Sequence, residues 1–135
     1  MTALHKIKDR FPLNNYILII ISVLLNASAQ LFIKRGMMAI GTISLDASSL
    51  VTLIFKATTS IPILLGMASY AVSILLWMVV LSRINVSLAY PFLSVGYVFT
   101  AVFAYAFFNE PLTIQKVLGI LVICAGIVIL STSKG

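Results

Sequence analysis

Four long apolar runs constrain the fold of this 135-residue chain more than any other feature of its sequence. They cover residues 16–33, 61–81, 86–108 and 112–131. Each is close to the roughly 17 to 25 residues with which a helix crosses a bilayer core of about 30 Å. A transmembrane β-barrel would instead show segments of about ten residues with alternating polarity. The sequence therefore predicts an all-α integral membrane protein, with four transmembrane helices forming a single membrane domain over 1–135.

The amino-acid composition agrees with a membrane protein and argues against nucleic-acid binding. Hydrophobic residues make up 61% of the chain and charged residues 9%, whereas a soluble domain carries about a quarter charged residues. The formal net charge of +6 comes mostly from residues that flank the apolar runs, where basic side chains anchor to headgroups and set topology. The single cysteine, Cys124, cannot form an internal disulfide and is expected to be a packing residue.

The first connection, at 36–60, is unusually long and has a pattern of its own. Ser44 or Asp46 could cap a short helix with apolar surface at 50–55, and Lys56 near its end would suit the helix dipole. Such a helix is too short to span the membrane, so we expect it to lie along the interface. It would either cover the bundle or act as a lid or lipid-guiding element.

Basic residues predict the orientation only weakly. Residues 1–15 form a basic tail, and four spans place both termini on one side of the membrane. The basic residues on that side are Lys6, Lys8, Arg10, Arg83 and Lys134, and those on the other side are Lys34, Arg35, Lys56 and Lys116. The basic tail favours cytoplasmic termini. A difference of one charge leaves insertion in both orientations open.

Two short links order the last three spans. The link at 82–85 makes the second and third spans antiparallel neighbours. The third and fourth are joined by Asn109-Glu110-Pro111. Pro111 disfavours helical geometry in the preceding residue, so we expect it to end the third span, and Thr113 is a plausible cap for the fourth.

The first apolar run carries a polar stripe. Ser22, Asn26, Gln30 and Lys34 recur every four residues, which places them on one face of a helix. Polar groups in hydrocarbon normally turn to the bundle interior or to a wet cavity, where they often mark a substrate route. The alternative interpretation is that they only form hydrogen bonds with neighbouring helices.

Two further runs could complete a groove around this stripe. The third run has Ser87, Tyr90, Ser94 and Tyr97 at helical spacing, with Pro91 and Gly96 as either a hinge or a simple kink. The second run adds residues at similar spacing, although core packing explains these equally well. The candidate substrate-binding residues are Ser22, Asn26, Gln30, Lys34, Arg35, Tyr70, Ser73, Trp77, Tyr90, Ser94, Tyr97 and Glu110.

The kinds of residue that are missing also limit the function. No span has an acidic residue in its middle, although exchange of protons for a cation usually needs a buried carboxylate. Glu110, at the end of the third span, could pair structurally with Lys116, Lys34 or Arg35. The sequence has no metal-ligand cluster around its one histidine, His5, and no nucleotide-binding loop or nucleophile elbow. We therefore expect no enzyme activity, no cofactor and no metal.

The fourth run differs from the others because it carries a seam of small residues. Gly119 and Gly126 lie one heptad apart, with Ala125 beside the second. Such a seam allows a second helix to approach closely. We predict that the fourth helix forms the dimer interface.

Three segments together resemble a known family. They are Leu88-Ala-Tyr-Pro-Phe-Leu-Ser94, Phe108-Asn-Glu-Pro-Leu-Thr113 and the apolar stretch from Val117 to Leu130. They resemble the EamA-type unit of the drug/metabolite transporter superfamily, which includes the small multidrug resistance proteins. Within it, the helix-one glutamine and lysine, the Ala-Tyr segment and the long first connection are most similar to the four-helix subunits of aminoarabinose-phospho-undecaprenol flippases. The resemblance covers 15–133.

The resemblance implies a dimeric transporter of the bacterial inner membrane that moves a polyprenyl-phosphate-linked sugar or similar anionic lipid. Its partner would be an identical chain or a related four-helix subunit, with an antiparallel arrangement permitted. Asn26 stands where the multidrug branch has its helix-one glutamate, so the carboxylate of drug/proton exchange is absent. Two alternatives remain: an exporter of cationic drugs or metabolites, and a non-transporting membrane subunit that assists a lipid-modifying enzyme.

Overall fold

The computed structural model describes residues 13–132, and within them every regular element is a helix. The all-α prediction is therefore confirmed for this part of the chain. The elements are α2 (Leu13–Ile40), α3 (Ala47–Thr59), α4 (Ile61–Leu81), α5 (Val86–Ala89), the 3-10 turn η1 (Tyr90–Phe92), α6 (Leu93–Phe108) and α7 (Ile114–Thr132). The predictions for His5, Lys6, Lys8, Arg10 and Lys134 fall outside the described residues.

Three of the described helical segments are long and apolar enough to cross a membrane. They are Asn14–Ile40, Ile61–Leu81 and Val86–Phe108, the last comprising α5, η1 and α6. The apolar stretch of α7, Ile114–Ile129, is shorter. Several spans are thus supported by length and composition, while a fourth span in α7 stays a prediction.

Helix α2 runs to Ile40, past the predicted end of the first span at residue 33. Gly36 does not end it, because this glycine is buried against α4 and a Cβ there would overlap the side chain of Ile63. The helix ends instead at Gly41, whose φ is +90° and whose N–H donates to the carbonyl of Met37 at 2.9 Å. The connection to α3 is correspondingly shorter than predicted.

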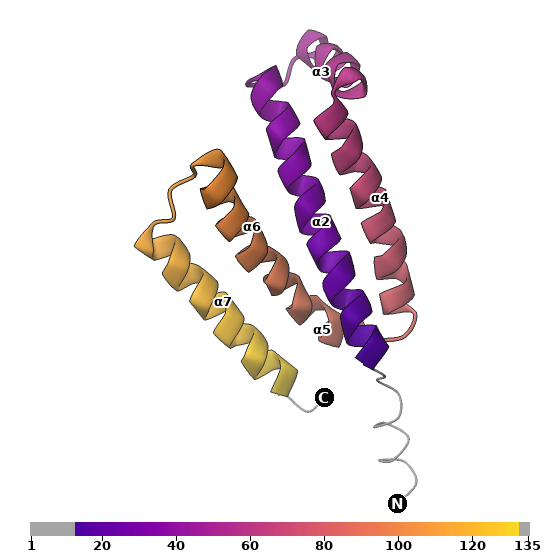
Figure 1. Ribbon diagram of the computed structural model, residues 1–135, viewed down its shortest axis with the longest axis vertical. Coiled ribbons are helices and arrows are strands. Elements are labelled where there is room, and N and C mark those ends of the chain that lie inside the picture. The colour runs from indigo at the N-terminus through magenta and orange to yellow at the C-terminus, as the bar shows by residue number, and fades with distance from the viewer. Residues whose placement is uncertain (1–12, 133–135) are drawn as a thin grey trace, which may run out of the picture.

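Helix α3 begins at the predicted cap and lies across one end of the α2 and α4 pair (Figure 1). Asp46 is its N-cap and accepts a hydrogen bond from the Ser49 N–H at 3.0 Å, while the hydroxyls of Ser44 and Ser48 also donate to its carboxylate. These hydrogen bonds hold the pKa of the Asp46 carboxyl well below its usual range. Lys56 lies in the last turn, and no residue of α3 is buried.

Helices α2 and α4 form the most extensively packed pair in the described chain (Figure 1). Their close approach depends on Gly66, because a Cβ there would lie only 2.8 Å from the carbonyl oxygen of Ala29. The Ser73 hydroxyl donates to the carbonyl of Ser22 at 2.9 Å, which adds a hydrogen bond between the two helices. This pair forms the closely packed side of the bundle.

The third apolar segment changes from α-helix to a 3-10 turn at a proline, one of the two positions that the sequence suggested for a hinge or kink. The chain forms a 3-10 turn at Tyr90–Phe92 between α5 and α6. Pro91 has no backbone N–H and cannot continue regular α-helical bonding, which accounts for the change. Buried side chains gather where this turn meets α2 and α4, and these are Ile19, Val23, Val80, Ile84 and Ala89.

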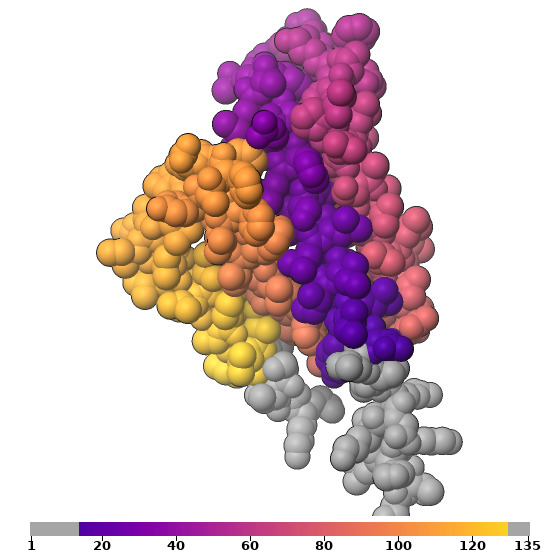
Figure 2. Space-filling model, viewed as in Figure 1, coloured from indigo at the N-terminus to yellow at the C-terminus, as the bar shows by residue number. Residues whose placement is uncertain are grey.

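Helix α7 has little contact with the rest of the chain and lies beside α6 (Figures 1 and 2). The residue that ends α6 is Asn109 rather than Pro111: it adopts a left-handed conformation (φ 52°), and its N–H donates to the Ala104 carbonyl. Thr113 caps α7 as predicted, since its hydroxyl accepts from the Lys116 N–H at 3.3 Å. Most described side chains of α7 are exposed.

Candidate functional site

Two adjoining cavities run along one side of α2, and we refer to them together as the polar groove. One, of about 370 Å³, lies between α2 and α6, and the other, of about 180 Å³, lies where α2, α4 and Leu93 of α6 meet. Val23, Asn26 and Leu93 line both, so the two lie side by side. The polar and aromatic residues that line them are Ser22, Asn26, Gln30, Tyr70, Ser73, Trp77, Tyr97 and Thr100.

The polar groove contains an amide pair on α2. The Nε2 of Gln30 donates to the Oδ1 of Asn26 at 3.1 Å. This bond fixes the two side chains relative to each other while leaving the Asn26 amide N–H groups and the Gln30 carbonyl to face a ligand. The pair can therefore both donate to and accept from hydroxyl groups.

Two predicted site residues use their hydroxyls for helix packing instead. Ser22 and Ser73 are buried, and the Ser22 hydroxyl donates to the carbonyl of Ile19 at 2.8 Å in its own helix. The Ser73 hydroxyl donates to the carbonyl of Ser22. Both residues line the groove, but their donors are occupied. For these two the structure supports the interpretation that polar residues bond neighbouring helical backbone.

Three of the predicted aromatic residues line the polar groove, whereas Tyr90 and Ser94 do not. Tyr70 and Trp77 on α4 and Tyr97 on α6 line the groove. Tyr90 is exposed outside this lining and contacts the edge of Trp77, with ring centroids 6.4 Å apart. Ser94 is buried, and its hydroxyl donates to the Pro91 carbonyl at 2.9 Å, which stabilises the turn rather than the groove.

An ion pair joins α2 to the link that follows α6. The Nζ of Lys34 lies 3.5 Å from the Oε1 of Glu110, and the two side chains are 52% and 40% exposed. Glu110 also lines a smaller cavity of about 210 Å³ between α6 and α7, together with Lys116. Of the three basic partners that the sequence offered to Glu110, the structure pairs it with Lys34. The amide pair and this ion pair lie along the same stripe of α2.

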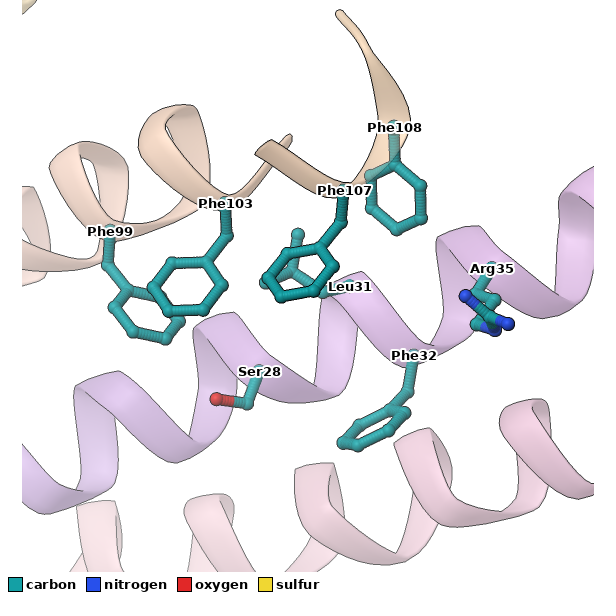
Figure 3. Close-up of a pocket in the computed structure, with 8 residues that line it drawn as sticks. All are labelled: Ser28, Leu31, Phe32, Arg35, Phe99, Phe103, Phe107 and Phe108. Carbon is teal, nitrogen blue, oxygen red and sulfur yellow. The ribbon is translucent and has the colours of Figure 1, made fainter. Parts of the chain in front are cut away.

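A second groove, which the sequence analysis missed, lies on the other side of the contact between α2 and α6 (Figure 3). It has a volume of about 400 Å³ and we refer to it as the phenylalanine groove. Its lining residues are Ser28, Leu31, Phe32, Arg35, Phe99, Phe103, Phe107 and Phe108. The signal was present in the sequence, because phenylalanines at positions 99, 103 and 107 recur every four residues and so share a helical face.

The small-residue seam of α7 lies on an open face. No atom of the described chain lies within 4 Å of where a Cβ on Gly119 or Gly126 would be. These glycines therefore make no close helix contact within one chain. Among the described residues, no group of three histidine, cysteine, aspartate or glutamate side chains could hold a metal ion.

A comparison with protein families shows which family this chain belongs to. The model of the EamA-like transporter family matches residues 13–132, which is the whole described part of the chain. The chain belongs to this family. The resemblance inferred from the three sequence segments is thus confirmed.

This EamA-like transporter is also similar to curated proteins of one name, the probable 4-amino-4-deoxy-L-arabinose-phosphoundecaprenol flippase subunit ArnF. That of Aeromonas hydrophila subsp. hydrophila is 34% identical over 122 residues, covering 89% of this chain and 81% of its own. That of Photorhabdus laumondii subsp. laumondii is 31% identical over 123 residues, covering 88% and 98%. That of Serratia proteamaculans is 38% identical over 111 residues, covering 78% and 83%.

No solved structure matches this EamA-like transporter significantly. The assignment to the family therefore rests on sequence, and the apolar helices agree with it. Both indicate a multi-pass membrane protein. The two grooves flanking the α2–α6 contact could each receive a ligand.

Proposed function

We propose that this protein is a subunit of a transporter that moves a polyprenyl-phosphate-linked sugar, or a similar anionic lipid, across the bacterial inner membrane. The observation that carries the proposal is the polar groove. Its described lining offers amide, hydroxyl and aromatic groups and contains no carboxylate. Amides and hydroxyls bond sugar hydroxyls in both directions. The names of the relatives support the same substrate class.

The charges at one end of α2 fit an anionic lipid better than a cationic drug. Lys34 and Arg35 lie there, close to the end of the polar groove marked by Gln30. Basic side chains attract a phosphate, and arginine can bond two of its oxygens at once. Glu110 forms an ion pair with Lys34, and the hydroxyls of Ser44 and Ser48 bond the Asp46 carboxylate beyond the end of α2. A lipid phosphate would therefore meet a net positive charge.

The proposed membrane arrangement has α7 as the fourth span and α3 as an interfacial helix. Helix α3 is amphipathic and too short to span, and it exposes Leu50, Ile54 and Phe55, as a helix lying in the headgroup region does. The start of α2 and the end of α7 lie at the same end of the molecule (Figure 1), as four spans require. We place that end in the cytoplasm on the strength of the basic tail.

The protein is proposed to work as a dimer, with an identical chain or a related four-helix subunit, and an antiparallel pair is permitted by the nearly balanced basic residues. The relatives are named as subunits, and the described part of a single chain leaves its grooves open on one side. The exposed seam of Gly119 and Gly126 is the proposed contact. Gly119→Leu together with Gly126→Leu should then convert a dimer to monomer in detergent, as measured by native mass spectrometry. A dimer that persists would count against the seam.

A reconstituted assay tests the transport function. Proteoliposomes would contain undecaprenyl-phosphate-linked amino sugar, the class of substrate named for the relatives, and a membrane-impermeant amine reagent would measure how much of the sugar faces outward. The full chain is tested alone and with a related four-helix subunit. We expect outward exposure to increase faster in protein-containing vesicles than in empty ones.

Paired variants link the activity to the polar groove. Asn26→Leu with Gln30→Leu removes the amide pair and should slow transport about tenfold, because each net hydrogen bond contributes about 0.5 to 1.5 kcal/mol. The matched control is Asn85→Leu with Gln115→Leu, two amides outside the groove, and it should transport normally.

Three results would overturn the proposal, and each would lead to a different conclusion. Equal rates in both double variants would remove the amide pair from the substrate path. Transport of an organic cation but not of the lipid would favour a small-molecule exporter. Absence of transport of either compound, with and without the partner subunit, would favour a non-transporting subunit that assists a lipid-modifying enzyme.

A further inference from the structure

Apart from Arg35, the residues that line the phenylalanine groove have no role in the function proposed above, because this groove lies on a different face of α2 from the polar groove. Asn26 and Gln30 line the polar groove, whereas Leu31, Phe32 and Arg35 line the phenylalanine groove. Positions on a helix that differ by one residue point about 100° apart, so the two grooves present different surfaces, which suit different parts of one amphipathic ligand.

The wall contributed by α6 is a row of stacked rings (Figure 3). The Phe99 and Phe103 ring centroids are 4.2 Å apart with planes inclined by 30°, and those of Phe103 and Phe107 are 5.6 Å apart with planes inclined by 15°. From Phe99 to Phe108 the helix rises roughly 14 Å, about half the hydrocarbon core of a bilayer. This wall is therefore extended and apolar, which suits a hydrocarbon chain that runs along α6.

One end of this groove carries a positive charge. Arg35 lies on the same side of α2 as Phe32 and near Phe108 (Figure 3). It is the one charged residue among the groove's lining, and no described carboxylate forms an ion pair with it. The neighbouring Lys34, by contrast, is bonded to Glu110. The two adjacent basic residues thus differ: Arg35 is available to an anion, and Lys34 is already paired.

We propose that the phenylalanine groove binds the polyprenyl chain of an anionic lipid whose phosphate is held by Arg35. This inference rests on the proposed function and names the site for the lipid part of its substrate. A polyprenyl chain is apolar, with double bonds and methyl branches along its length, so it can pack against the successive rings of this wall. The guanidinium bonds phosphate oxygens in a fixed, bidentate geometry.

The proposal separates recognition of the lipid from recognition of the sugar. The chain and the phosphate are bound on one side of the α2–α6 contact, and the sugar is bound on the other side by the amide pair. Changes in the phenylalanine groove should therefore alter affinity for the carrier lipid whether or not a sugar is attached. This expectation allows the groove to be tested without the glycosylated substrate.

The test is a titration of the purified full-length protein with undecaprenyl phosphate, followed by native mass spectrometry, which reads bound lipid and oligomeric state together. Phe103→Ala and, separately, Phe107→Ala should each weaken binding several-fold through loss of apolar contact. Arg35→Gln should weaken it about tenfold or more, because hydrogen bonds to charged groups are stronger than neutral ones. Binding of the uncharged undecaprenol should respond to the phenylalanine variants but not to Arg35→Gln.

Matched controls come from α3, outside both grooves. Phe55→Ala removes an exposed phenylalanine and Lys56→Gln removes an exposed basic residue, and both should bind undecaprenyl phosphate as the unchanged protein does. Phe107 is itself 66% exposed, so its truncation removes little packing. This makes the Phe107 variant informative even where the Phe103 variant folds poorly.

The outcomes distinguish this inference from the transport function. Unchanged lipid binding in Phe103→Ala and Phe107→Ala would overturn the groove assignment, and transport by the same variants would show that the proposed function survives it. Equal weakening of phosphatidic acid binding would overturn the choice of a polyprenyl chain. A dimer that dissociates in Phe107→Ala with lipid binding intact would make the groove a subunit interface. If the unchanged protein binds the lipid but transports nothing, the groove assignment stands and the proposed transport function is overturned.

Discussion

Helix α2 is packed in two different ways on its two sides. Toward α4 the backbones come close at Gly66, and a serine hydroxyl bonds across the contact. Toward α6 the contact is narrower and is flanked by the polar groove and the phenylalanine groove. The same helix thus provides a close-packed face and a face lined with cavities.

This difference separates the part of the molecule that carries stability from the part that can receive a ligand. Close packing maximises dispersion contacts and resists rearrangement. Helices with few contacts open and shift at low free-energy cost. We therefore expect α6 and α7 to move relative to the α2–α4 pair, with the ion pair between Lys34 and Glu110 joining the two parts at one end.

The largest effect should come from filling the close contact between α2 and α4. In Gly66→Leu the new side chain meets the Ala29 backbone and the Ile33 side chain, and overpacking of this kind costs about 1 to 3 kcal/mol. Thermal unfolding in detergent should show a clearly lowered midpoint. The matched control is Ala68→Leu, at an exposed position of the same helix. Equal midpoints for the two variants would mean that the α2–α4 face is not the more tightly packed one.

A smaller effect is expected from the hydrogen bond across the same contact. Ser73→Ala removes the donor to the Ser22 carbonyl, and interhelical hydrogen bonds in membrane proteins contribute about 0.6 kcal/mol on average. The free energy of unfolding, measured by titration with a denaturing detergent, should fall by roughly this amount. Ser87→Ala, at an exposed serine, serves as control. A loss well above about 2 kcal/mol would instead indicate that Ser73 supports further packing.

The smallest change in stability should come from the ion pair on the open side. Glu110→Gln leaves Lys34 without its partner, and exposed ion pairs contribute about 0 to 1 kcal/mol. The free energy of unfolding should fall by a few tenths of a kcal/mol at most, and high salt should reduce the difference. If the ion pair restrains α6, spin labels on α2 and on the α6–α7 link should nevertheless report a broader distance distribution. A distribution as narrow as in the unchanged protein would show that packing alone positions α6.

The sequence predicted the helical class well because hydrophobic patterns dominate it. Apolar runs of membrane length admit few other folds, and Asp46 and Thr113 are caps in the structure as expected. One boundary depended on tertiary context that a local pattern does not contain, because Gly36 stays inside α2 where α4 packs against it. The third span ends at residue 108 as predicted, although the left-handed Asn109 rather than Pro111 is the residue that ends it.

The candidate site was predictable where it follows one helix and less so where helices meet. The four-residue spacing of Asn26 and Gln30 correctly placed them on one face, and both line a cavity. Spacing could not show that the Ser94 hydroxyl bonds its own helix at Pro91, since that depends on the local turn. The phenylalanine groove was missed because phenylalanines in an apolar span do not stand out from the other apolar residues around them, even at regular spacing.

The length of helix α2 determines how deep its basic residues lie in the membrane. Its 28 residues extend for roughly 42 Å, more than the hydrocarbon thickness of about 30 Å, so the helix must tilt or protrude. Lys34 and Arg35 begin about 30 Å from its start, near the depth at which hydrocarbon gives way to headgroups. A thicker bilayer would draw both side chains inward and force them to snorkel, and a thinner one would release them into water. The affinity of this end of the protein for phosphate should therefore depend on the acyl-chain length of the host membrane.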